Sequence, residues 1–339
     1  MKKLLALLLS IVLVLGVFTA CTAANDPGTE KAPTNDTVET PEEPKVAELT
    51  KVVALKGPTG MGMAKLITDA DPKYSFELTS MPDDVTSSLI SGTVDIAAVP
   101  TNLASVLYNK TQGGVKVIAL NTLGVLHIIN SDGTVASIED LKGKTIGATG
   151  QASTPEYVLD YVLKANGIDP ENDVTINYYT DHAELATHMI SGDVTIGMLP
   201  EPQVSTVLMK NGDCKKVINL TEEWSKVSPD SALVQGCIVV RTAFAEEYPD
   251  TVKNFLEEYK ASVEFANTDE TAPDVIANLG IVGSSAIAKS AIPGANICYV
   301  DSNDAMKEKL SGFLKVLLDA NPKSVGGALP GDDFYYENK

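Results

Sequence analysis

Two stretches one hundred residues apart decide the fold: ISGTVDIAAVP at Ile90–Pro100 and ISGDVTIGMLP at Ile190–Pro200. Extended without a gap to Lys110 and Lys210, the two copies share eight identities in twenty-one positions. Unrelated sequences of average composition would share about one or two. In each copy a glycine that can end a helix precedes a short apolar run and a proline. We interpret the pair as an internal repeat of one supersecondary unit.

Each copy predicts a helix followed by a strand that is buried on both faces. Ahead of the first glycine, Val85 and Leu89 stand four residues apart, as on the apolar face of a helix. Leu185 and Met189 repeat this spacing behind Asp181, a residue type that favours the N-cap position. The apolar run after each glycine has the length and composition of a parallel strand covered by helices on both sides.

A further strand, loop and helix lie upstream of each copy. The first set is a strand at residues 52–55 and a helix through about residue 70, and the second is a strand at 145–148 and a helix to about residue 165. Each copy is therefore predicted to form a doubly wound βαβαβ unit, which binds ligands at the carboxyl ends of its strands. Two such units predict an α/β protein with two lobes and a ligand cleft between them.

The last third of the chain predicts helices that complete the core. Residues 249–267 and 303–317 carry large apolar side chains at helical spacing, and we expect both helices to pack on the first lobe. The chain would then cross between the lobes twice, which predicts a hinge. The predicted bounds are 51–130 with 242–339 for lobe 1 and 131–241 for lobe 2.

The N-terminus predicts export and a lipid anchor. Two lysines precede an apolar run, Leu4–Phe18, that is shorter than the ~20 residues of a membrane-spanning helix. Phe18–Cys21 resembles the bacterial lipobox, although Phe18 stands where an aliphatic residue is usual. We therefore expect residues 1–20 to be a signal peptide and Cys21 to carry lipid. Residues 21–50, rich in Pro, Thr and acidic side chains, are predicted to be a disordered linker.

Charge and cysteine content narrow the function classes. The formal net charge is −19, and Arg241 is the only arginine, so nucleic-acid binding is not expected. Beyond Cys21, the three cysteines Cys214, Cys237 and Cys298 cannot all pair, so at least one should be a free thiol.

Several motifs together resemble a known family. They are Asp140–Gly147 (DLKGKTIG), Ile238–Arg241 (IVVR) ahead of a Tyr-Pro pair, the repeat and the lipobox-like segment. From Lys51 to Asn267, and more weakly beyond, the chain resembles the extracytoplasmic substrate-binding proteins of ABC importers. The most similar group is the nitrate, sulfonate and taurine type, which includes binders of thiamine precursors. The resemblance implies a type II periplasmic-binding fold, closure around a small-molecule ligand and delivery to a membrane permease.

The resemblance also implies a monomer held by its lipid on the extracytoplasmic face of the cell membrane, with no cofactor and no catalysis. The sequence itself also lacks the common catalytic motifs. Gly57–Met63 lacks the lysine and spacing of a P-loop, and no Gly-x-Ser-x-Gly or Cys-x-x-Cys motif occurs. His182 and His188 lie six residues apart on one predicted helix and therefore point to different faces, so they make a poor metal-binding pair.

Position in the repeat supplies the candidate ligand-binding residues, which lie where strands lead into helices. They are Thr59, Gly60 and Met61, Thr101 and Asn102, Gln151, Ser153 and Thr154, and Glu201. Hydroxyl groups and free amides at helix N-termini can bind an anion or another hydrogen-bond acceptor. The alternative is that the Ser, Thr and Asn residues only cap their helices.

Ligand chemistry is predicted from two residues. Sulfonates are commonly held by arginine, and Arg241 is the only one available, in the predicted crossover. Glu201, if it points into the cleft, would repel an anion and accept hydrogen bonds from an amine. A neutral or weakly basic heterocycle, such as a pyrimidine precursor of thiamine, is therefore favoured. His182 and Trp224 could stack on such a ring, or could serve the surface and the core.

Two alternatives stay open at this point. The first is a receptor for a sulfonate- or nitrate-type anion within the same family. The second is a lipoprotein that senses a ligand for a membrane signalling partner, because transport and sensing need the same cleft.

Overall fold

The computed structural model describes residues 45–337, which belong to one compact unit. The predicted signal peptide, Cys21 and most of the predicted linker lie outside the described residues. The linker was predicted to extend to residue 50, and residues within its last part already form hydrogen bonds to the folded body. The Lys45 amide donates to Asp250 and the Ala47 amide to Thr251, each at 2.8 Å, and the first strand begins at Thr50. Hydrogen bonds to helix α10 order these residues before the strand starts.

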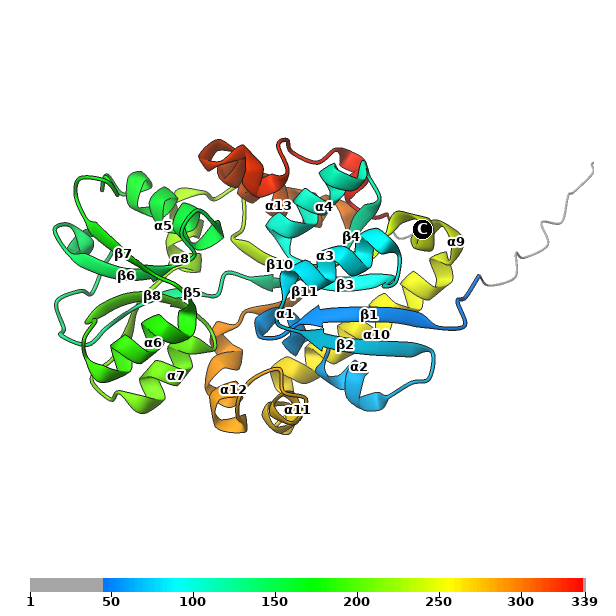
Figure 1. Cartoon of the computed structure of the whole chain (residues 1–339), viewed down its shortest axis with the longest axis horizontal. Helices are drawn as coiled ribbons and strands as arrows, with labels where there is room; N and C mark the ends of the chain where they lie inside the picture. The colour runs from blue at the N-terminus through cyan, green and yellow to red at the C-terminus, as the bar shows by residue number, and fades with distance from the viewer. Residues whose placement is uncertain (1–44, 338–339) are drawn as a thin grey trace, which may run out of the picture. The chain divides into compact units, whose positions relative to one another are not determined.

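Two mixed β-sheets, each covered by helices, confirm the predicted α/β fold (Figure 1). The first sheet has the strand order β11-β4-β10-β3-β1-β2 and the second has the order β7-β6-β8-β5-β9. The strands of the first sheet are β1 (Thr50–Leu55), β2 (Tyr74–Thr79), β3 (Ile96–Pro100), β4 (Val115–Leu123), β10 (Val234–Arg241) and β11 (Ile297–Val300). Those of the second are β5 (Leu126–Asn130), β6 (Thr145–Thr149), β7 (Thr175–Tyr179), β8 (Ile196–Pro200) and β9 (Lys215–Asn219).

Helices connect the strands and cover the faces of the sheets. They are α1 (Pro58–Met61), α2 (Ala64–Asp69), α3 (Pro82–Ser91), α4 (Thr101–Thr111), α5 (Thr154–Ala165), α6 (His182–Ser191), α7 (Gln203–Lys210), α8 (Leu220–Val227), α9 (Thr242–Glu247), α10 (Pro249–Thr268), α11 (Ala272–Asn278), α12 (Ser285–Ala291) and α13 (Asn303–Ala320). Short 3₁₀ turns lie at Glu139–Leu141, Ile292–Gly294, Pro322–Val325 and Asp332–Phe334.

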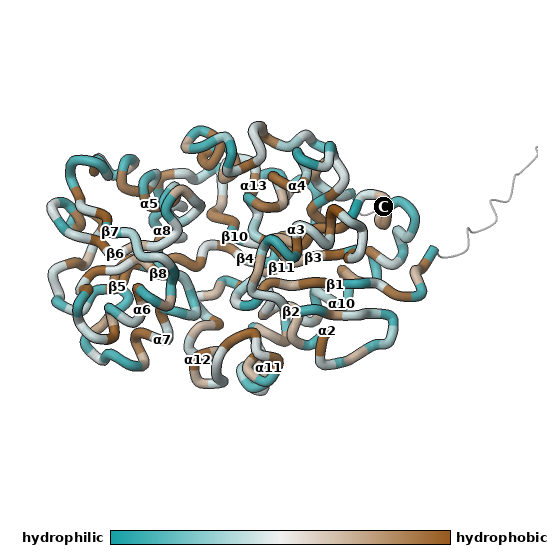
Figure 2. Tube along the Cα trace, viewed as in Figure 1, coloured by the Kyte–Doolittle hydropathy of each residue, from teal (hydrophilic) through white to brown (hydrophobic). Residues whose placement is uncertain are grey.

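The internal repeat is confirmed as a repeated βαβαβ unit. In the first sheet β1 pairs in parallel with β2 and β3, and in the second β6 pairs in parallel with β7 and β8. The predicted apolar pairs on α3 and α6 are buried. Gly92 and Gly192 end these helices with φ of 72° and 87°, a left-handed conformation that glycine adopts without strain. Figure 2 shows hydrophobic residues along β1 and β3 in the middle of the first sheet.

The predicted lobe boundaries do not coincide with the sheets. Residues 126–130, assigned to lobe 1, form β5 in the second sheet, and residues 234–241, assigned to lobe 2, form β10 in the first sheet. The chain therefore passes between the sheets at residues 124–125 and again between α8 and β10. Sequence patterns located the strands but gave no information on which sheet each strand joins.

The two C-terminal helices behave differently from one another. Helix α10 packs on the first sheet as predicted, because Val252, Phe255 and Tyr259 belong to its core. Helix α13 contacts both halves, since Phe313 packs edge-on against Trp224 of α8 with ring centroids 5.5 Å apart. Helix α13 thus packs on α4 and β10 of the first half, as expected, and additionally on α5 and α8 of the second half. No helix in residues 45–337 is long and apolar enough to cross a membrane.

All three cysteines within the described residues are free thiols, as predicted for at least one of them. Cys214 and Cys237 are buried, and burial raises the pKa of Cys298 to about 12. They therefore behave as small apolar side chains rather than as a disulfide framework.

Candidate functional site

The first crossing brings the carboxyl edges of the two sheets together. It joins the end of β4 to the start of β5, and the Val125 carbonyl accepts a hydrogen bond of 3.0 Å from the Glu201 amide, directly after β8. Asn296 holds the same crossing, because its carbonyl accepts from Leu123 at 3.0 Å and its side-chain amide donates to the Gly124 carbonyl. Ligands of doubly wound sheets bind at this edge, so the residues around the crossing form the candidate site.

Uncharged polar groups gather at the edge of the first sheet. The Asn121 side-chain amide donates to the Thr59 carbonyl at 3.0 Å, which ties the end of β4 to α1. Its Oδ1 atom and the Thr122 hydroxyl are buried and have no hydrogen-bond partner within residues 45–337. A Cβ atom on Gly236 would lie 2.5 Å from Asn121 Oδ1 and 2.9 Å from the Thr59 methyl group. Glycine at position 236 therefore makes room for the amide.

The sequence analysis did not identify Asn121, Thr122 or Gly236. All three lie on β4 and β10, which are outside the repeat that supplied the candidates. A signal was present, because the Asn-Thr pair interrupts the otherwise apolar run of residues 117–120 and 123–126. Polar residues inside a buried strand need partners, and an unpaired buried polar group points to a ligand or water.

The edge of the second sheet presents a similar set of uncharged groups. The Thr149 hydroxyl, at the end of β6, lies 2.5 Å from Nδ1 of His182. Thr154 has a buried hydroxyl without a partner, whereas the Ser153 hydroxyl donates to a loop carbonyl at 2.6 Å. Gln151 is exposed in the same loop. The predicted residues of this loop thus lie together, with Thr154 holding the unpaired group.

The predicted ligand-binding residues at the edge of the first sheet differ in their exposure. Thr59 and Asn102 are partly exposed at the edge, but Gly60 is buried and Met61 is fully buried in the core. The Thr101 hydroxyl is buried and donates to a carbonyl at the start of β10 at 2.6 Å. Thr101 thus secures the strand that follows the second crossing.

From its position in the sequence, Glu201 was expected to accept hydrogen bonds from a ligand amine. In the structure its carboxylate is already paired. Its side chain is completely buried, and Oε1 lies 3.0 Å from the Lys216 ammonium. Oε2 accepts a hydrogen bond of 3.1 Å from the Ser205 amide. A Cβ atom on Gly294, from the turn that precedes β11, would approach Oε1 to 2.7 Å. The pair therefore lies directly at the contact between the two halves.

His127, at the start of β5, is a neutral member of the same contact. It is 2 % exposed, and neither ring nitrogen makes a well-aligned hydrogen bond to the part of the chain that the structure describes. Burial and the nearby Lys216 charge lower the pKa of His127 to about 4, against a weaker opposing effect of the Gly294 backbone. The imidazole is therefore uncharged at neutral pH.

Arg241, the only arginine in the sequence, lies at the end of the first sheet that faces away from the candidate site. It ends β10, whereas the site adjoins the start of that strand. Its guanidinium donates to Asp95 at 2.6 Å and to the Val94 carbonyl at 2.9 Å. The expected position in a crossover is wrong, because β10 lies entirely within the first sheet.

Trp224 belongs to the core. It is 0 % exposed, packs against Tyr161 and Phe313, and donates from its indole nitrogen to the Ser231 hydroxyl at 3.1 Å. Of the two readings that the sequence left open for Trp224, the structure favours the core.

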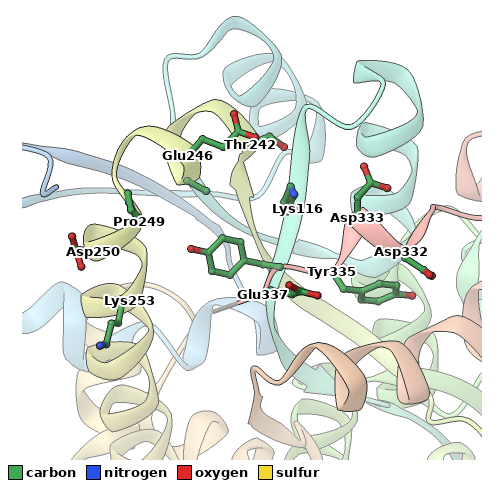
Figure 3. A pocket seen from close by; sticks show the side chains of 12 residues that line it. Lys116, Thr242, Glu246, Pro249, Asp250, Lys253, Asp332, Asp333, Tyr335 and Glu337 are labelled. Atoms are coloured by element: carbon green, nitrogen blue, oxygen red, sulfur yellow. The ribbon is translucent and has the colours of Figure 1, made fainter. Parts of the chain in front are cut away.

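A separate cavity of about 640 Å³ lies at the end of the first sheet that Arg241 also occupies (Figure 3). Lys116 near the start of β4 and Thr242 after β10 line it, together with α10 and the acidic segment Asp332–Glu337. The candidate site lies at the opposite ends of β4 and β10. Within residues 45–337, no group of three or more His, Cys, Asp or Glu side chains could hold a metal ion.

Two doubly wound sheets that meet at their carboxyl edges have the architecture of the type II periplasmic-binding fold. Solved structures agree on the fold. An ABC transporter protein from Parabacteroides distasonis superposes with a TM-score of 0.74 over 86% of this chain and 100% of that one, at 22% identity. The periplasmic aliphatic sulphonate binding protein SsuA from Escherichia coli gives a TM-score of 0.66 over 86% and 92%, at 15% identity.

A sequence profile described as "NMT1/THI5 like" matches residues 76–272, which is more than half of the chain, so the chain belongs to the NMT1/THI5-like family. A curated relative, "Putative binding protein YtlA" from Bacillus subtilis (strain 168), is 27% identical over 213 residues. The alignment covers 57% of this chain and spans about three fifths (61%) of that relative's length.

Proposed function

We propose that this protein is the substrate-binding component of an ABC-type importer. It captures a small solute between the carboxyl edges of its two sheets and delivers it to a membrane permease, with no catalytic step. The two segments that pass between the sheets serve as the hinge for closure. Family membership, the shared fold and the polar groups at both edges support this proposal.

One observation carries the choice of ligand class. The unpaired polar atoms at the two edges belong to uncharged side chains: Asn121, Thr122 and Thr154. Arginine commonly grips sulfonates and carboxylates, and the only arginine here is bound to Asp95 at the other end of the sheet. The site therefore suits an uncharged polar solute, for which a pyrimidine precursor of thiamine is our leading candidate.

The burial of Glu201 removes the reason to expect a basic ligand. A ligand amine would have to displace Lys216 from the carboxylate, so Glu201 no longer favours a basic ligand. The sulfonate- or nitrate-type alternative rests on helix N-termini at the edges, which can bind anions without arginine.

Thermal melting of residues 44–339 tests the ligand class. Hydroxymethylpyrimidine is expected to raise the melting temperature, and at 100 times its dissociation constant it would add roughly 2.7 kcal/mol of stability. Taurine, methanesulfonate and nitrate are the matched anionic probes and are expected to produce no shift. A shift with the anions alone would reject the uncharged class and leave the importer role standing.

We further propose that Cys21 carries a lipid that holds the protein on the extracytoplasmic face of the membrane. The lipobox-like Phe18–Cys21 and the acidic, proline-rich segment after it support this anchor. Cys21→Ala is expected to move the full-length protein from the membrane fraction to the medium, or to leave it unprocessed, with unchanged ligand affinity. Processing and membrane retention identical to wild type would remove the anchor from the account.

A further inference from the structure

The contact between Thr149 and His182 joins two loops at the ligand edge of the second sheet. Thr149 is the last residue of β6 and is 1 % exposed, and His182 is the first residue of α6, which follows β7 (Figure 1). The Thr149 hydroxyl and His182 Nδ1 lie 2.5 Å apart. The contact fixes the imidazole ring relative to the strand end.

The buried hydroxyl determines which ring nitrogen carries the proton. His182 Nδ1 is the hydrogen-bond partner of the Thr149 hydroxyl among the described residues, and the distance alone fits donation in either direction. If Nδ1 carried the proton, it would donate to the oxygen and leave a buried hydroxyl hydrogen unpaired, which costs free energy. In the neutral ring the proton therefore resides on Nε2, which becomes a donor.

The Nε2 atom of His182 is unpaired among the described residues. It is also not one of the fully buried polar atoms that lack a partner there. Burial lowers the pKa of His182, and the charge of Asp181, the N-cap of its own helix, opposes this only in part. The ring is therefore neutral at physiological pH, with one nitrogen held by Thr149 and the other without a partner within residues 45–337.

We propose that Thr149 fixes His182 in the Nε2–H form, and that this single donor selects solutes that present a hydrogen-bond acceptor, such as a ring nitrogen or a carbonyl oxygen. Thr149 is thus a positioning residue and His182 a ligand-contacting residue. This inference rests on the proposed function for its ligand, while the state of the ring can be tested without one.

The ligand-free test is ¹⁵N NMR of residues 44–339 with labelled histidine. The chain has only three histidines, so His127→Gln and His188→Gln assign the spectrum. His182 is expected to show the Nε2–H tautomer and to titrate below ~6.5, the ordinary value. Thr149→Val should abolish the tautomer preference, and Thr149→Ser should restore it. An Nδ1–H tautomer in the wild type, or an unchanged spectrum in Thr149→Val, would overturn the proposal.

The binding test uses hydroxymethylpyrimidine as the probe. His182→Phe keeps a flat ring but removes the donor, and it should weaken binding roughly three- to tenfold, as expected for one hydrogen bond. Thr149→Val should weaken it less, and Thr149→Ser should match wild type. Unchanged affinity in His182→Phe would overturn the selection role. If the wild-type protein does not bind hydroxymethylpyrimidine, the proposed ligand class is rejected. The NMR result then still decides whether Thr149 holds His182 as an Nε2–H donor.

Discussion

Replacing Lys216 with methionine is expected to lower the free energy of unfolding by about 2 to 3 kcal/mol. The Glu201 carboxylate is completely buried, and the substitution removes the cation 3.0 Å from it while keeping a long apolar side chain. Breaking a buried ion pair typically costs about 3–5 kcal/mol, and the lower figure used here reflects the 34% exposure of Lys216. Urea denaturation of residues 44–339 at pH 7 measures the change.

A matched control separates this buried pair from an ordinary surface pair. Lys315 and Asp319 form an ion pair of 2.8 Å, with side chains 63% and 62% exposed. Lys315→Met should therefore cost no more than about 0.5 kcal/mol. Equal effects of Lys216→Met and Lys315→Met would show that the Glu201 contact does not stabilise the fold.

The same Lys216→Met variant should respond differently to acid. In the wild type His127 is neutral when folded down to a pKa of about 4, whereas an unfolded histidine takes up a proton near pH ~6.5. This histidine therefore makes stability fall as the pH drops from ~6.5 toward ~4. Removal of Lys216 takes away one charge that lowers the pKa of His127, so the deficit relative to wild type should narrow between pH 7 and pH 4.5.

Gly124→Ala is expected to destabilise the protein by about 1–3 kcal/mol and to weaken ligand binding. Gly124 lies in the first crossing, where a Cβ atom would overlap the Thr221 hydroxyl and a Leu233 methyl group. Leu233 belongs to the second crossing, directly ahead of β10, so the added methyl group would push the two crossings apart. Overpacking of a tight contact typically costs this much. Denaturation and probe binding measure the two effects.

Two further variants make the Gly124 result specific. Gly283 has nothing within 4 Å of an added Cβ atom, so Gly283→Ala should leave stability and binding unchanged. In Gly124→Ala/Thr221→Ala one of the two clashes is relieved, and the double variant should recover part of the loss. A Gly124→Ala protein with wild-type stability and affinity would show that the spacing of the crossings is not critical.

The fold could be predicted from the sequence because the determining signals are local and occur twice. Gly92 and Gly192 end equivalent helices, and the apolar runs that follow them can only be buried strands. The sheet that a strand joins depends on long-range contacts. No local pattern shows that β5 belongs to the second sheet and β10 to the first. The packing of α13 on the second half was missed for the same reason, since its apolar stripe fits one core or two equally well.

The candidate site could be predicted only where the repeat supplied positions. The loop that carries Ser153 and Thr154 was located correctly at the edge of the second sheet, because it follows a strand of the repeat. Asn121 and Gly236 were missed because they lie on strands added outside it. Glu201 was placed correctly after its strand, but its pairing with Lys216, fifteen residues further along the chain, depends on tertiary contact.

The location of the bound solute tests the central claim most directly. A crystal structure of residues 44–339 with the compound that most raises the melting temperature is the decisive measurement. We predict that the compound lies between Asn121 and Gly236 on one edge and Thr149 and His182 on the other. A compound bound instead in the cavity beside Lys116, with the two edges empty, would contradict the account.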